Sequence, residues 1–195
     1  MKKFPEIQIS GWFFVFLAVI LLTVPLPWIL AAVLAALFHE FCHIAVILIL
    51  GGKIHGFMLY PGGAVLEVSD LNPGRELLSA AAGPAGSFLL MIFVSSFPRL
   101  CVCGLIQGLY NLLPIYPLDG GRILSCGLRI FMCEAETEKI SRVVEKVTVS
   151  ALIVFSVLGC FCYSWGYQAA ILIFLGIFKG FYGKIPCKAG SLRVQ

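Results

Sequence analysis

Two histidines and a glutamate lie within five consecutive residues of an otherwise apolar segment of this chain. The segment reads LAALFHEFCHIAVILIL, from Leu34 to Leu50, and its ionisable residues are His39, Glu40 and His43. An ionisable side chain near the centre of a membrane-length helix costs about 2.5–3.5 kcal/mol or more on insertion scales. Three such residues so close together therefore indicate chemistry rather than packing.

The spacing of these residues is typical of a hydrolytic zinc site. An α-helix places His39 and His43, four positions apart, on one face, where two neutral imidazoles can ligate a single zinc ion. Glu40 lies about 100° further around the helix and can take a proton from a water molecule beside the metal. The H-E-x-x-H pattern has this mechanism in metalloproteases. The alternative is a chance cluster of buried polar residues, which the insertion cost disfavours.

A third metal ligand is needed, because catalytic zinc sites usually have three protein ligands and a water. Asp119 follows an apolar run, in NLLPIYPLDGGR, and the surrounding prolines and glycines predict irregular backbone. Such backbone is tolerated at membrane depth only where it is buried in protein or lines a cavity. We therefore expect Asp119 to lie near His43. The alternative is an Asp119–Arg122 surface pair or a helix N-cap.

The composition indicates an integral membrane protein. Of 195 residues, 60% are hydrophobic and 12% charged, with a mean hydropathy of +1.00, too apolar for a soluble domain. The net charge of +4 is small and its basic residues lie between apolar runs, so we expect no nucleic-acid partner. We predict an all-α polytopic fold, a single domain over residues 1–195, with about six membrane spans: 11–24, 28–50, 77–97, 100–113, 147–163 and 165–181.

The basic residues also predict an orientation. If the N-terminus is cytoplasmic, nearly all Lys and Arg residues fall on the cytoplasmic side and Arg99 falls outside. We therefore expect both termini to be cytoplasmic, in a membrane that we take to be a bacterial cell membrane. Two cysteine pairs, Cys101/Cys103 and Cys160/Cys162, then lie toward the outer face. Packing is the expected role of these cysteines, and a disulfide between the pairs stays open.

Two connections between the predicted spans contain further structure. Gly51–Glu76 has turn residues on both sides of the β-prone AVLEV, which predicts one or two short strands associated with the membrane after the histidine-bearing helix. Pro114–Lys146 predicts a turn followed by an amphipathic helix at the cytoplasmic interface.

With these segments identified, the chain resembles the site-2 protease family of intramembrane zinc metalloproteases, peptidase family M50. The resemblance rests on HEFCH at 39–43, NLLPIYPLDGGRIL at 111–124 and the small-residue stretch AAGPAGS at 81–87. LYPGGAVLEV at 59–68 is similar to a segment of the sporulation-type branch, the stage IV sporulation protein FB group.

The resemblance implies one zinc ion per chain, bound by His39, His43 and Asp119, with Glu40 as the catalytic base. Asn111 then either contacts substrate or orients the catalytic water, and its alternative role is a hydrogen bond between helices. The implied reaction is cleavage within or next to a transmembrane segment of a membrane-tethered substrate, such as a transcription factor precursor in a sporulation or stress pathway. The expected partners are that substrate, the bilayer and a membrane regulator.

The chain departs from the family pattern in three places. It has Cys42 where many members have glycine, and we expect neither a PDZ-like insertion nor a C-terminal nucleotide-sensing domain. Two other functions stay open. A zinc or proton transporter would use the same side chains but usually has repeated halves, which we do not find in the sequence. A catalytically inactive scaffold would have no need of Glu40.

Overall fold

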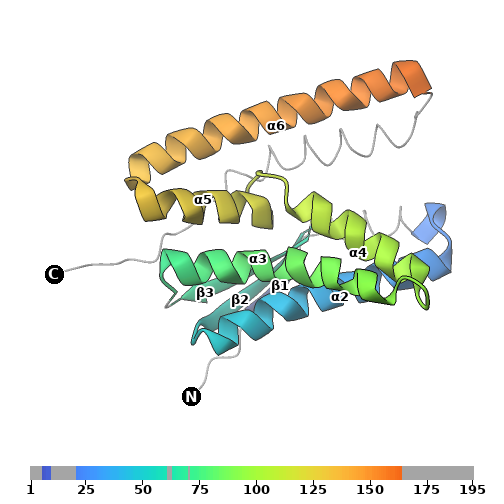
Figure 1. Cartoon of the computed structure of the whole chain (residues 1–195), viewed down its shortest axis with the longest axis horizontal. Coiled ribbons are helices and arrows are strands. Elements are labelled where there is room, and N and C mark those ends of the chain that lie inside the picture. Colours follow the sequence, from blue (N-terminus) through green and yellow to red (C-terminus); the bar gives the residue numbers. More distant parts are fainter. Residues whose placement is uncertain (1–5, 10–20, 61–62, 70, 164–195) are drawn as a thin grey trace.

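Helices make up most of the part of the chain that the computed structural model describes, which is residues 6–9, 21–60, 63–69 and 71–163 (Figure 1). The helices are α2 (Leu26–Ile49), α3 (Pro73–Leu89), the short 3-10 helix η1 (Leu90–Phe93), α4 (Pro98–Asn111), α5 (Asp119–Phe131) and α6 (Glu134–Tyr163). The strands are β1 (Glu6–Ile9), β2 (Lys53–Tyr60) and β3 (Gly63–Ser69). Most of the predicted span 11–24, and all of 165–181, lie outside the described residues.

Helix α2 buries mainly small and polar residues and exposes large apolar ones, the reverse of a helix in a soluble protein. Its buried residues recur every four positions and are mostly small or polar: Ala31, Ala35, His39, His43 and Ile47. Large apolar side chains lie exposed on other faces, among them Leu37 and Phe41 at 62% and 63%. The helix ends where Gly51 adopts a φ of 79°, which suits glycine, and Gly52 N donates to the Ile47 carbonyl oxygen over 2.9 Å. Exposed leucines around a partly polar interior are typical of helices that face lipid.

Helix α3 is the central helix, because it packs against α2, α4 and α5. Asn72 caps its N-terminus by accepting a hydrogen bond from the backbone N of Arg75 over 2.9 Å. The buried residues of α3 are small: Ser79, Ala80, Gly83, Pro84, Gly86 and Ser87. Small residues let neighbouring backbones approach closely. A Cβ at Gly86 would overlap Cys42 Sγ, so the cysteine of the H-E-x-x-H segment occupies the space that this glycine leaves.

A three-stranded sheet in the order β1-β2-β3 accompanies the helices. Strand β2 is antiparallel to β3, with Tyr60 opposite Gly63 and an irregularity between Ile54 and Gly56. Strand β1 pairs in parallel with β2, with Glu6 opposite Gly56. Strands β2 and β3 lie in the connection where the sequence predicts short strands. Strand β1 was not predicted.

Helices α5 and α6 follow the loop that contains the Pro114 and Pro117 turns, and α6 packs on α5 (Figure 1). The sequence predicts an interfacial helix up to Lys146 and a separate span from Val147, whereas the structure has one continuous helix from Glu134 to Tyr163. The physical reason is that neither proline nor glycine occurs between Glu134 and Leu158 to interrupt the helix.

Two of the described helical segments are long and apolar enough, by length and composition, to cross a membrane. These are Leu26–Ile49 and Pro73–Phe93, which overlap the predicted spans 28–50 and 77–97. The six-span arrangement stays a prediction. Cys101 and Cys103 are free thiols, and Cys101 Sγ donates to the Leu90 carbonyl oxygen over 2.8 Å. The side chains of Cys160 and Cys162 lie outside the described part of the chain.

Candidate metal centre

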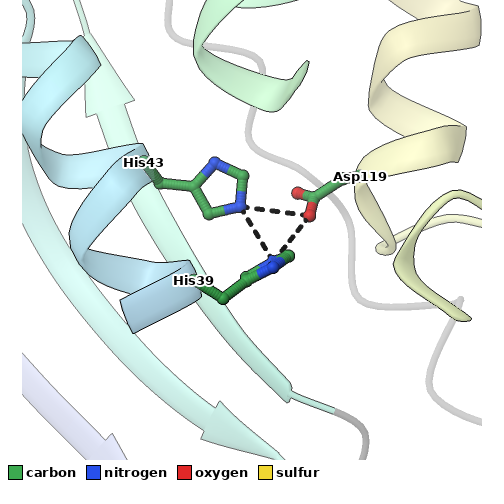
Figure 2. A group of neighbouring side chains, drawn as sticks. All are labelled: His39, His43 and Asp119. Atoms are coloured by element: carbon green, nitrogen blue, oxygen red, sulfur yellow. Dashed lines mark hydrogen bonds and ion pairs between the residues drawn. The ribbon is translucent and has the colours of Figure 1, made fainter. Parts of the chain in front are cut away.

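Three side chains from two helices converge on one point inside the helical layer (Figure 2). His39 and His43 project from α2, and Asp119 projects from the start of α5. Asp119 Oδ2 lies 3.0 Å from Nε2 of each histidine, and the two Nε2 atoms are 3.2 Å apart. All three residues are buried.

Helix α3 provides the contact partner of the Nδ1 atom in each imidazole ring. His43 Nδ1 lies 2.7 Å from the backbone carbonyl oxygen of Ser79, and since a carbonyl only accepts, Nδ1 donates its proton there. His39 Nδ1 lies 2.8 Å from Ser87 Oγ. Ring contacts of this kind fix the orientation of metal-binding histidines and leave Nε2 free to coordinate.

The cluster fits a zinc ion. With its proton on Nδ1, His43 presents an Nε2 lone pair to the Asp119 carboxylate, so two acceptors face each other at 3.0 Å. Such a pair needs a positive charge between its members, from a metal ion or from a further proton on an imidazole. A tetrahedral zinc ion with bonds of about 2.0–2.1 Å spaces its ligand atoms about 3.3–3.4 Å apart, close to the separations observed. Two imidazoles and a carboxylate are also a common catalytic zinc ligand set.

Gly83 of α3 leaves the space that an ion needs. A Cβ added at Gly83 would lie 2.7 Å from His39 Nε2 and closer still to His43 Nε2. Any residue other than glycine would therefore occupy the volume directly in front of both ligand nitrogens. The site is open to a small ion because the α3 backbone has no side chain at this position.

Asp119 is ionised at neutral pH. Burial alone would raise the pKa of its carboxyl, but the neighbouring imidazoles, when protonated, lower that pKa to about 2. Asp119 is also the first residue of α5, where the positive end of the helix dipole favours a carboxylate. The backbone at Gly120 packs closely against the end of α4 and so helps to position Asp119, because a Cβ at Gly120 would overlap the Leu112 carbonyl oxygen.

The two remaining predicted site residues lie beside this cluster. Glu40 is half-buried, and its carboxyl is close enough for the charges of His43, His39 and Asp119 to act on it. Asn111, the last residue of α4, places its Nδ2 atom 3.4 Å from His39 Nε2. All five predicted site residues are therefore neighbours in space.

The sequence reasoning missed the contribution of α3. Glu76, Ser79, Gly83 and Ser87 are spaced by three or four residues, so they lie on one face of that helix and toward the cluster. The available signal was the alternation of small polar residues and glycine in an apolar helix. Part of that pattern, AAGPAGS at 81–87, supports the family resemblance, but it assigns no contact to the histidines.

Replacing Gly83 by alanine should abolish zinc binding, because the new methyl group would fill the space in front of both Nε2 atoms. We expect the zinc content of the purified protein to fall to background. The matched control is Gly127→Ala in α5, where an added Cβ meets nothing within 4 Å. Normal zinc content in Gly83→Ala would show that the ion does not lie against α3.

Sequence comparisons relate this chain to known zinc metalloproteases. The sequence profile of the Peptidase M50B-like family matches residues 12–110, just over half of the chain. A zinc metalloprotease of Methanocaldococcus jannaschii is 30% identical over 135 residues, which is 62% of this chain and 40% of the relative. A relative from Synechocystis sp. is 32% identical over 120 residues, 50% of this chain and 32% of its own length. The chain thus spans less than half the length of these relatives.

A solved structure shares the fold. The site-2 protease from Methanocaldococcus jannaschii superimposes with a TM-score of 0.70 at 24% sequence identity, over 93% of this chain and 91% of the other. At this identity the likeness concerns the fold.

Proposed function

This chain belongs to the Peptidase M50B-like family, and from that premise we propose that it is a zinc metalloprotease which cleaves membrane-tethered substrates within or next to a transmembrane segment. One observation carries the proposal. Nε2 of His39, Nε2 of His43 and Oδ2 of Asp119 converge within 3.2 Å in a buried site, with Glu40 beside them.

We assign each residue a separate role. His39, His43 and Asp119 hold one zinc ion per chain, which when bound would polarise the scissile carbonyl and lower the pKa of water toward about 7. Glu40 accepts a proton from the attacking water and returns it to the leaving amine. Asn111 orients that water or contacts the substrate. Burial of the cluster excludes bulk water, which strengthens the electrostatic interactions among these groups.

We place the protein in the membrane, with the site toward the cytoplasmic end of α2. The exposed large apolar side chains of α2, α3 and α4 support this placement, because a soluble helix layer would bury them. The distribution of basic residues supports cytoplasmic termini and six spans.

Reporter fusions test this orientation. Fusions after Arg75, Lys146 and Gln195 should report a cytoplasmic location, whereas a fusion at Arg99 should report an external one. An external signal at Lys146 would contradict the six-span arrangement. It would not alter the geometry of the metal cluster.

The substrate must present an extended segment, since a membrane helix keeps its carbonyls in internal hydrogen bonds. Strands β2 and β3 directly follow the histidine helix in the chain, and the sheet that they form with β1 offers backbone groups for pairing with an extended peptide. A tethered transcription factor precursor suits a site at cytoplasmic depth. A sporulation-type pathway and a membrane regulator belong to this proposal on the strength of the LYPGGAVLEV resemblance.

A cleavage assay with metal removal tests the activity. The full chain in liposomes would be mixed with a single-span membrane protein that has a helix-destabilising residue in its span, and products would be mapped by mass spectrometry. We expect cleavage in or beside the span, loss of cleavage after chelation, and recovery with added zinc. Cleavage that persists in the fully metal-depleted protein would contradict the mechanism. Zinc binding without any cleavage would favour the transporter or scaffold.

A further inference from the structure

The second oxygen of the Asp119 carboxylate faces an arginine. While Oδ2 points at the two histidines, Oδ1 lies 3.9 Å from Nη1 of Arg122, one turn along α5. Nη2 of Arg122 lies 3.9 Å from Oε1 of Glu76 in the first turn of α3. The guanidinium group therefore lies between a metal-site carboxylate and a carboxylate of the central helix.

The Glu76 carboxylate is held in place by a second residue of α5. Cys126 is buried and lies one turn after Arg122, and its thiol hydrogen-bonds with Glu76. Burial and the Glu76 carboxylate raise the pKa of the Cys126 thiol to about 12, so it stays protonated and donates. Cys126 thus holds the Glu76 carboxylate, which in turn lies 3.9 Å from the Arg122 guanidinium group.

Helix α3 already holds the two histidines through Ser79 and Ser87. Glu76 lies on the same face of α3 and extends this support through Arg122 to the third member of the cluster. The distances of 3.9 Å exceed those of hydrogen bonds, so the interaction is electrostatic. It is effective because the Arg122 side chain is only 18% exposed and is therefore weakly screened by salt.

We propose that Arg122, held by Glu76, is a positioning residue that directs the Asp119 carboxylate so that one oxygen faces the metal and the other faces the guanidinium. This inference rests on the zinc site of the proposed function. Without the positive charge, Oδ1 is free to turn toward the ion or to draw the carboxylate away from it. Zinc would then bind more weakly and with a different coordination.

The test measures metal binding by the purified full chain. The variants are Arg122→Gln, Arg122→Lys and Glu76→Gln, and the matched control is Arg129→Gln, an exposed arginine two turns further along α5. The zinc dissociation constant is obtained by competition with a chromophoric chelator. The visible spectrum of the Co²⁺-substituted protein reports coordination number, because a tetrahedral ion absorbs more strongly than a higher-coordinate one.

We expect Arg122→Gln to raise the zinc dissociation constant about 10-fold, as is usual for groups that orient metal ligands, and to alter the Co²⁺ spectrum. Arg122→Lys should recover part of both properties because it restores the charge. Glu76→Gln should have the same effect in a weaker form. Arg129→Gln should match the wild type.

Two results would overturn the inference. One is unchanged affinity and an unchanged Co²⁺ spectrum in a folded Arg122→Gln protein, and the other is an equal loss in Arg129→Gln. If circular dichroism shows that Arg122→Gln is unfolded, Glu76→Gln becomes the deciding variant. A zinc dissociation constant and a Co²⁺ spectrum equal to those of the wild type would then overturn the inference. A wild-type chain that binds neither metal would instead overturn the proposed function itself.

Discussion

Replacing Glu40 by glutamine is expected to lower the rate of substrate cleavage by about 10²–10⁴-fold while zinc stays bound. The glutamine amide has the size of the carboxylate but cannot accept a proton at neutral pH, so the variant removes the base alone. His39, His43 and Asp119 keep their mutual geometry, since Glu40 is not a member of that cluster. Metal analysis and the liposome cleavage assay on the same preparation provide the measurement.

The control for this variant is Glu138→Gln. Glu138 lies on α6, is 64% exposed and pairs with Arg142 over 2.6 Å, so its loss should change neither zinc content nor cleavage. Normal cleavage by Glu40→Gln would require another base. Loss of zinc from Glu40→Gln would show that Glu40 is a ligand rather than a proton acceptor.

Replacing Asp119 by asparagine is expected to remove zinc and activity together. The substitution exchanges an ionised oxygen ligand for a weak neutral one in a buried site, and we expect zinc affinity to fall on the order of 10²-fold or more. The fall in cleavage should follow the fall in bound zinc. Titration of each preparation with zinc, with cleavage measured at every step, separates this result from misfolding, because excess zinc should restore part of the activity.

The same variant distinguishes the two roles that the sequence left open for Asp119. An exposed pair with Arg122 would be worth about 0–1 kcal/mol, and its loss would leave zinc and cleavage nearly unchanged. Asp119 is instead buried, with Oδ2 directed at both histidines. The burial and direction of this carboxylate are what the sequence alone did not provide.

The helices could be located from hydropathy, but their ends could not. The apolar run that predicts a span from residue 77 belongs to a helix that begins at Pro73, because Asn72 caps the backbone before the apolar residues start. Hydropathy reports which residues suit lipid, whereas caps report where backbone hydrogen bonds begin. Strand β1 was missed for a related reason. A four-residue strand is defined by its pairing with β2 about fifty residues later, and local sequence contains no sign of that pairing.

Part of the metal cluster could be predicted from the sequence, because two of its three residues lie close together in the chain. Two histidines four residues apart share a helix face in any α-helix. The free-energy cost of placing ionisable residues in an apolar, membrane-length segment indicates that they have a function. Asp119 lies eighty positions after His39, and only its turn-rich surroundings indicated it as a candidate for the third metal ligand. The residues of α3 could not be assigned, because a serine hydroxyl, a backbone carbonyl and a missing side chain at Gly83 acquire their roles through packing alone.

The measurement that tests the central claim most directly is the zinc content of the wild-type chain and of His39→Ala, purified in the same detergent and buffer. We predict about one zinc ion per wild-type chain and a background level in His39→Ala, because a single histidine and Asp119 leave too few ligands. Full zinc occupancy in His39→Ala, or a wild-type chain that takes up no zinc, would contradict the site built from His39, His43 and Asp119.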